Sequence, residues 1–155
     1  MLNGETCKNC EPSKINGLIE GARPARTVID MRWMLRSKIH RATVTEANVD
    51  YVGSISIDED LMVAAGIEEW EKVHVLDVTN GARLETYAIK APAGSGKICI
   101  NGAAARLIHP NDLVILVTYE AIPSETVNEH LPTIVHVDSN NCIVDLSHSI
   151  DAAEY

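Results

Sequence analysis

Residues 98–108 read I-C-I-N-G-A-A-A-R-L-I, and this stretch combines a strand, a turn and a helix. Its isoleucines alternate with other residues, which is the period of a half-buried β-strand. Asn101-Gly102 is a strong turn dipeptide, because both residues tolerate a positive φ. Residues 103–108 then predict a short helix that stops at His109-Pro110, since proline cannot continue it.

The rest of the chain repeats this arrangement of short strands and turns. Further strands are predicted at residues 39–44, 73–78, 113–117 and 134–137, which are rich in β-branched or aliphatic residues. The run at 113–117 is wholly apolar, as expected of a strand buried on both faces. Asn80-Gly81 predicts another turn, and Asp58 can cap a second short helix that ends at Gly66. Many short strands with two short helices favour a mainly β fold, a compact β-barrel.

Composition limits the classes of function. The chain has 155 residues, 46% of them apolar, which is enough for one domain with a single sizeable core. Its formal net charge of −9 argues against general nucleic-acid binding, which needs a surplus of Lys and Arg. It lacks both an apolar run of about 20 residues and the layout of a secretory signal. These features predict a cytoplasmic protein that does not bind a membrane.

The sequence divides into three parts. Residues 1–33 are predicted to be a flexible N-terminal extension, 34–140 the barrel domain, and 141–155 a C-terminal tail with no assigned function. Cys7 and Cys10 form C-K-N-C within the extension. A structural zinc site usually needs a second such pair, or histidines at fixed spacing, and neither is present. The sequence therefore predicts no metal site.

Gly53-Ser54 is the pair that carries the chemistry. A serine after a conformationally permissive glycine is a place where a backbone can be strained enough to cleave itself, although most such pairs are ordinary turns. The motifs around it are K-I-H-R at 38–41, Tyr51, N-G-A-R at 80–83, Thr86-Tyr87 and N-G-A-A-A at 101–105. In this order and spacing, from about residue 34 to 138, the chain resembles the bacterial aspartate 1-decarboxylase family.

The resemblance implies a fold, an activity and a cofactor. The fold is the double-psi β-barrel, assembled as a homotetramer with active sites between neighbouring subunits. The activity is conversion of L-aspartate to β-alanine and CO2 for pantothenate biosynthesis. The cofactor is a pyruvoyl group derived from Ser54 after self-cleavage between 53 and 54, and it forms a Schiff base with the substrate. Cleavage is spontaneous in some members and needs a maturation factor in others.

The same resemblance implies roles for individual residues. Thr86 would stabilise the oxyanion of the cleavage step and Tyr87 would be the proton donor of decarboxylation. Arg83 and Lys38 would pair with the two substrate carboxylates. The pocket around the substrate would be formed by Asn101 and by Gly102, Ala103 and Ala104; the backbone N–H groups of the last three can face an anion.

Several alternatives stay open at this point. Residue type alone would make Thr86 an ordinary strand residue, Tyr87 a packing residue, and Arg83 and Lys38 solvated cations. His40 can line the pocket or be a structural histidine, and Tyr51 can orient the cleavage loop or the imine. The alternative functions are decarboxylation of another small acidic amino acid, and an uncleaved barrel that only binds a ligand or protein. Leu76 occupies a place where some family members have tryptophan.

Overall fold

The computed structural model describes residues 30–149, and residues 31–149 belong to one compact unit. Residues 1–29, with Cys7 and Cys10, and residues 150–155 lie outside the described residues. The first strand begins at Met31. Residues 31–33 therefore belong to the sheet rather than to the predicted extension.

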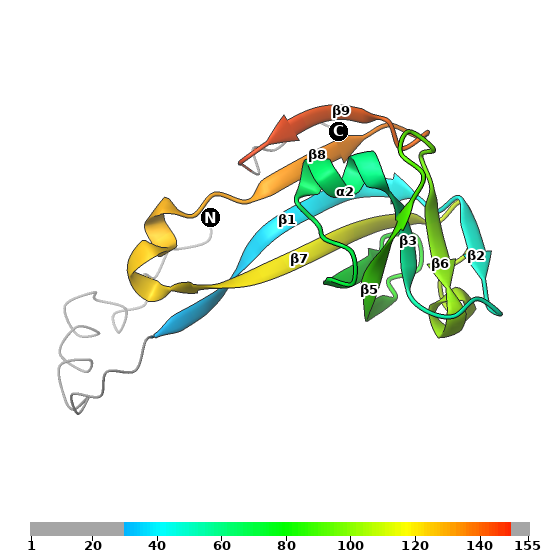
Figure 1. Ribbon diagram of the computed structural model, residues 1–155, viewed down its shortest axis with the longest axis horizontal. Coiled ribbons are helices and arrows are strands. Elements are labelled where there is room, and N and C mark those ends of the chain that lie inside the picture. Colours follow the sequence, from blue (N-terminus) through cyan, green and yellow to red (C-terminus); the bar gives the residue numbers. More distant parts are fainter. Residues whose placement is uncertain (1–29, 150–155) are drawn as a thin grey trace, which may run out of the picture. The chain divides into compact units, whose positions relative to one another are not determined.

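Nine strands form one sheet in the order β2-β6-β3-β5-β4-β7-β1-β8-β9 (Figure 1). The strands are β1 (Met31–Thr43), β2 (Glu46–Asn48), β3 (Ile55–Asp58), β4 (Lys72–Asp77), β5 (Arg83–Ala91), β6 (Ile98–Asn101), β7 (Leu113–Pro123), β8 (Thr133–Val137) and β9 (Ile143–Ser147). The prediction of a mainly β fold with short helices is confirmed, and the arrangement is consistent with a double-psi β-barrel.

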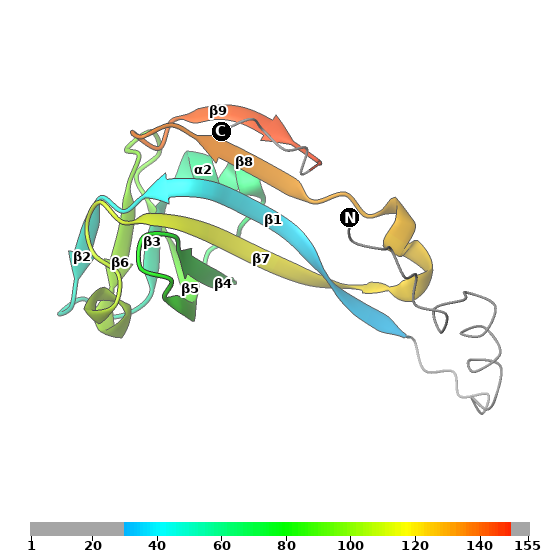
Figure 2. The ribbon, with the colours of Figure 1, turned by 180° about the vertical axis from the view of Figure 1, so that it is seen from behind.

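Two long strands, β1 and β7, are neighbours in the sheet. β1 and β7 pair antiparallel from Met31 opposite Pro123 to Thr43 opposite Leu113, and both views show them side by side (Figures 1 and 2). β8 pairs parallel to the other edge of β1. β1 is therefore hydrogen-bonded on both sides by strands from the second half of the chain.

The core lies between β1, β3, β4, β6 and β7. Its largest fully buried side chains are mostly isoleucines, because β-branched residues pack well on a pleated surface. The alternation read in residues 98–108 continues on β3 and β4, where Ile55, Ile57, Val73 and Val75 are all 0% exposed. β6 is buried along its whole length.

The helix predicted after Asp58 is α2 (Glu59–Ala65). Asp58 accepts a hydrogen bond from Asp60 N at 2.8 Å, and Gly66 ends the helix with φ 63°. The helix predicted at 103–108 is instead a 3-10 helix, η1 (Gly102–Arg106), which ends two residues earlier. A second 3-10 helix, η2 (Ser124–Glu129), has no counterpart among the predicted elements. No helix within residues 30–149 is long and apolar enough to cross a membrane.

Candidate active site

The register of three neighbouring strands brings the predicted cleavage site together with two other candidate residues. β3 pairs parallel with β5, with Ile55 opposite Ala88, and antiparallel with β6, with Ile55 opposite Ile100. Ser54 precedes Ile55, so it lies beside Tyr87 on one side and Asn101 on the other. Asn101 N donates a hydrogen bond to the Ser54 carbonyl at 2.9 Å.

The backbone at the cleavage site is strained. Gly53 has φ 83° and Ser54 has φ 76°, so two consecutive residues adopt the left-handed region. Glycine tolerates this conformation, but serine does so only at a cost in free energy. Ser54 is also buried, with 4% of its surface exposed, and its hydroxyl has no hydrogen-bond partner among the described residues. A buried hydroxyl without a partner is unfavourable, and such groups concentrate at reactive sites.

A pocket of about 350 Å³ opens next to this bond. It is lined by Gly53, Ser54, Leu84, Glu85, Thr86, Tyr87, Asn101, Ala103, Ala104 and Leu107. Seven of these residues were predicted to belong to the site. The seven come from β5, the end of β6, η1 and the loop before β3. Among the described residues of the lining, only Glu85 carries a charged side chain.

Tyr87 lies directly against Gly53. A Cβ atom placed on Gly53 would overlap the Tyr87 hydroxyl oxygen and lie 3.0 Å from Tyr87 Cζ. The absence of a side chain at position 53 is therefore what allows the phenol to approach the cleavage site. Gly102 lies next to the same loop, but a Cβ there would make only ordinary contacts, 3.4 Å from the Tyr51 carbonyl oxygen and 3.6 Å from Gly53 N.

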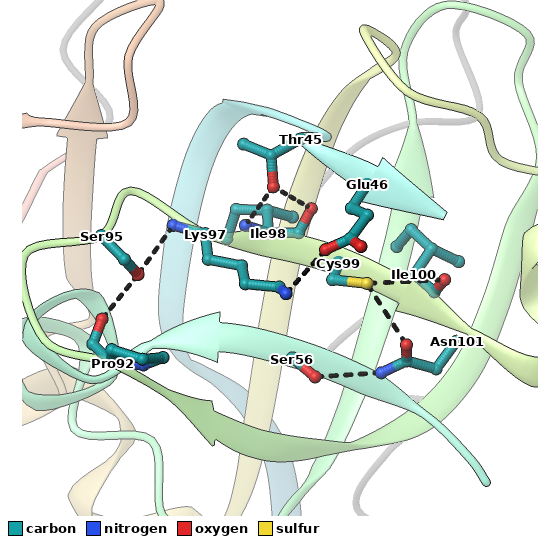
Figure 3. A network of polar contacts seen from close by, with 10 residues as sticks. All are labelled: Thr45, Glu46, Ser56, Pro92, Ser95, Lys97, Ile98, Cys99, Ile100 and Asn101. Atoms are coloured by element: carbon teal, nitrogen blue, oxygen red, sulfur yellow. Dashed lines mark hydrogen bonds and ion pairs between the residues drawn. The ribbon is translucent and has the colours of Figure 1, made fainter. Parts of the chain in front are cut away.

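The side chain of Asn101 is fixed by two partners that the sequence reasoning did not select. Asn101 Nδ2 donates to Ser56 Oγ at 3.0 Å, and Cys99 Sγ donates to Asn101 Oδ1 at 3.3 Å (Figure 3). Burial raises the pKa of the Cys99 thiol, so it keeps the proton that it donates. The period of two along a strand could have found Cys99, which shares a strand face with Asn101.

Five predicted site residues do not line this pocket, and one of them, Gly102, is the first residue of η1 beside it. Arg83 is exposed at the start of β5, opposite Leu76 of β4. Tyr51 is 50% exposed and lines a second cavity, of which Asn101 also forms part of the wall. Lys38 and His40 lie on β1, which β4 and β7 separate from β5 in the sheet. One chain therefore brings Ser54, Thr86, Tyr87 and Asn101 together, but not the predicted cations.

The residues on β1 have shifted pKa values. Burial lowers the pKa of Lys38. Burial, and to a smaller extent the positive charges of Lys38, His136 and Arg41, lowers the pKa of His40 to about 4. His40 and His136 are opposite each other in the β1 and β8 pairing, with their rings edge to face at 5.5 Å. His40 is therefore neutral at pH 7.

Within residues 30–149 there is no group of three or more His, Cys, Asp or Glu side chains placed to hold a metal ion. Ser54, with its buried hydroxyl, and the small side chains of Ala103 and Ala104 line the pocket.

Comparison with known proteins agrees with this geometry. The sequence profile of a family described as aspartate decarboxylase matches residues 31–144. The aspartate 1-decarboxylase of Corynebacterium efficiens is 58% identical over 124 residues, which cover 80% of this chain and 90% of that protein. The aspartate 1-decarboxylase of Caldicellulosiruptor saccharolyticus is 58% identical over 121 residues, covering 78% and 94%. That of Bacillus cereus (strain G9842) is 56% identical over 115 residues, covering 74% and 91%.

Proposed function

The chain belongs to the aspartate decarboxylase family, and from this premise we propose that it is a self-processing, pyruvoyl-dependent enzyme that converts L-aspartate to β-alanine and CO2. The observation that carries the proposal is the strained Gly53–Ser54 segment, which lines the pocket and whose buried serine hydroxyl has no partner among the described residues. β-Alanine is the building block that pantothenate biosynthesis requires.

Self-processing begins with Ser54. Its hydroxyl attacks the Gly53 carbonyl and transfers the acyl group from nitrogen to oxygen, which gives an ester. Thr86 lines the same pocket and is suited to donate a hydrogen bond to the oxyanion of this step. Elimination from the ester releases the Gly53 carboxylate and leaves dehydroalanine at position 54. Addition of water and loss of ammonia then leave a pyruvoyl group at the start of the downstream fragment.

The residues of the pocket then have separate tasks in decarboxylation. The pyruvoyl group supplies the electrophile that takes up the electrons released with CO2. Tyr87 would return a proton to the former α-carbon of the substrate, and the contact of its hydroxyl with Gly53 supports this role. The hydrogen bonds from Asn101 to Ser56 and from Cys99 to Asn101 hold the Asn101 amide in one orientation beside the substrate. Ala103 and Ala104 are small and leave room for the substrate.

The two substrate carboxylates need cations that the pocket of one chain lacks. We therefore propose a homotetramer with sites between neighbouring subunits, in which Lys38 of one copy completes the pocket of another and Arg83 pairs with the second carboxylate. The exposed apolar side chains of Met31, Trp33 and Tyr119 on the long strands support such an assembly. Gly102 and Tyr51 support the loop at the cleavage site, and His40 accompanies Lys38 on β1.

Another small acidic amino acid is the alternative substrate, because one methylene usually changes discrimination by only about 1 to 3 kcal/mol. A panel of L-aspartate, L-glutamate and shorter and longer analogues separates the two, and we expect the highest kcat/KM for L-aspartate.

The direct test is an intact mass spectrum of the denatured protein beside that of Ser54→Ala. We expect two fragments from the unchanged chain, one ending at Gly53 and one starting at position 54 and lighter by one ammonia than a serine-started chain. Ser54→Ala should stay whole, fold normally and have no activity.

A single uncut mass that persists after incubation, both alone and with a cell extract that supplies a maturation factor, would favour the uncleaved binding barrel. A cleaved or active Ser54→Ala protein would contradict the assignment of the cofactor to Ser54.

A further inference from the structure

The turn before β4 holds an aromatic residue in a conformation that bulky side chains rarely adopt. Trp70 has φ 70°, and it is the only aromatic residue with a positive φ in the part of the chain that the structure describes. Glycine or asparagine would occupy this position with less strain. Backbone strain of this kind persists where the surrounding structure enforces it, and it is common at functional sites.

Burial does not explain the tryptophan. Trp70 is 67% exposed, so most of its surface gains nothing from the hydrophobic effect. It also does not line the pocket beside Ser54. A reason for tryptophan at this position must therefore come from what its ring contacts.

The backbone of the turn is hydrogen-bonded to β5 at Ala88, the residue after Tyr87. Trp70 N donates to the Ala88 carbonyl at 2.9 Å, and Ala88 N donates to the Glu71 carbonyl at 2.9 Å. The turn is closed by Glu71, whose carboxylate accepts from Glu68 N at 2.9 Å and also pairs with Arg36 of β1. These bonds fix the position of the Trp70 backbone relative to the residue that follows Tyr87.

The indole stacks on the phenol ring of Tyr87, with ring centroids 5.6 Å apart and an angle of 28° between the planes. Offset stacking of this kind is favourable beyond the area that it buries. The hydroxyl end of the same ring lies against Gly53. Among residues 30–149 no hydrogen bond orients the Tyr87 hydroxyl, so the position of the ring depends on packing contacts such as those with Trp70 and Gly53.

We propose that Trp70 is a positioning residue for the proton donor: its indole holds the Tyr87 ring in the orientation that places the hydroxyl over the reacting carbon. The inference rests on the proposed function of Tyr87. It predicts that losing the indole impairs proton transfer while leaving the fold and the substrate-binding residues intact.

The first experiment measures the ring contact without any activity. In the uncleaved Ser54→Ala chain with labelled tyrosine, the Tyr87 ring protons should be shifted upfield by the indole, and Tyr87→Phe identifies their signals. Trp70→Gly should move these signals downfield, whereas Trp70→Phe should retain part of the shift. Asn111→Gly, which relieves a similar φ of 74° away from the site, should leave them unchanged.

The second experiment measures catalysis in chains that mass spectrometry shows to be fully cleaved. Trp70→Gly should keep a melting temperature at or above that of the unchanged chain, because glycine relieves the strain. Its kcat should fall by about three- to tenfold, less than the loss of about 100-fold or more expected for removing a general acid, with KM for L-aspartate little changed. The solvent deuterium isotope effect on kcat should rise, Trp70→Phe should recover most of kcat, and Asn111→Gly should be unaffected.

A double-mutant cycle decides whether Trp70 acts through Tyr87. Trp70→Gly should cause no further loss of kcat in a Tyr87→Phe background, because the group that it positions is already absent. An unchanged Tyr87 signal in Trp70→Gly, an unchanged kcat, or a full additional loss in the Tyr87→Phe background would each overturn the proposal. Failure of the proposed function itself would instead be seen as an unchanged chain that does not decarboxylate L-aspartate.

Discussion

At the scale of single residues, Gly53 shows how tightly the site is built around one peptide bond. Gly53→Ala adds a methyl group that would overlap the Tyr87 hydroxyl, at a φ that L-residues disfavour. We expect the folded chain to lose about 1 to 2 kcal/mol of stability from the backbone alone, and more from displacing the tyrosine. Self-cleavage, followed by mass spectrometry over time, should slow markedly.

Gly81→Ala is the matched control for this substitution. Gly81 has nearly the same φ, 81°, but a Cβ there would meet nothing within 4 Å. It should therefore show the backbone cost without any effect on cleavage. Equal cleavage rates for the two alanine variants would mean that contact between Gly53 and Tyr87 plays no part in processing.

The family resemblance that the motifs carry selected Ser54, Thr86, Tyr87 and Asn101, and all four line one pocket. The sequence reasoning did not select Cys99, which the strand period could have found, and it could not select Ser56; these two residues fix the Asn101 amide. Ser56 lies on a different strand, and its hydrogen bond exists only because Ser56 and Cys99 are opposite each other in the β3 and β6 register. The register of two strands depends on the whole sheet, so a local sequence motif does not predict it.

At the scale of elements, Asp58 joins the start of α2 to the β5–β6 loop, which is distant in sequence. Its carboxylate accepts from Asp60 N at the start of α2, and from Gly94 N at 3.1 Å and Gly96 N at 2.6 Å in the β5–β6 loop. Asp58→Ala removes the helix cap and leaves loop N–H groups without their partner, which should cost about 2 to 3 kcal/mol in a urea unfolding experiment. Asp60→Ala, on the exposed side of the same turn, should change stability by less than about 0.5 kcal/mol. Similar losses for the two variants would contradict this role.

The sequence predicted only one end of each of the two long strands, β1 and β7. The runs at 39–44 and 113–117 are the buried parts of β1 and β7, whereas the outer parts of both strands are more exposed and lack the apolar signal. β5 was not predicted as a strand, because its charged residues interrupt the apolar pattern. β9 is almost wholly exposed and owes its conformation to pairing with β8. Tertiary pairing, rather than local preference, decides such segments.

At the scale of the whole molecule, His40 links stability to pH. Its pKa is about 4 in the folded chain and 6.5 when unperturbed, so the unfolded chain takes up a proton first as the pH falls. The folded state therefore loses stability between about pH 6.5 and pH 4. We expect His40→Gln to lose less melting temperature than the unchanged chain between pH 7.5 and pH 4.5. His109→Gln, at a largely exposed side chain, should behave like the unchanged chain, and identical pH dependence in all three would contradict the assignment to His40.

Mixed assemblies test whether the site is shared between chains. Lys38→Ala and Ser54→Ala should each be inactive alone. Co-expressed, they should recover activity, because a Lys38→Ala chain keeps its own Ser54 and can receive Lys38 from its neighbour. Thr86→Ala with Ser54→Ala is the control, since Thr86 and Ser54 line one pocket of the same chain and no mixed site can contain both. Recovery in both mixtures, or in neither, would argue against a shared site.

The position of β1 in the sheet affects how the protein can unfold and refold after cleavage. A break after Gly53 would put β1 and β2 on one fragment, while β7, β8 and β6, which hold them by hydrogen bonds, lie on the other. Unfolding of the mature protein would then be a dissociation, so its midpoint would rise with protein concentration, and refolding would be a second-order reaction between two pieces. Folding as a single chain would be possible only before cleavage. Once the chain is cleaved, that unimolecular folding reaction could not be repeated.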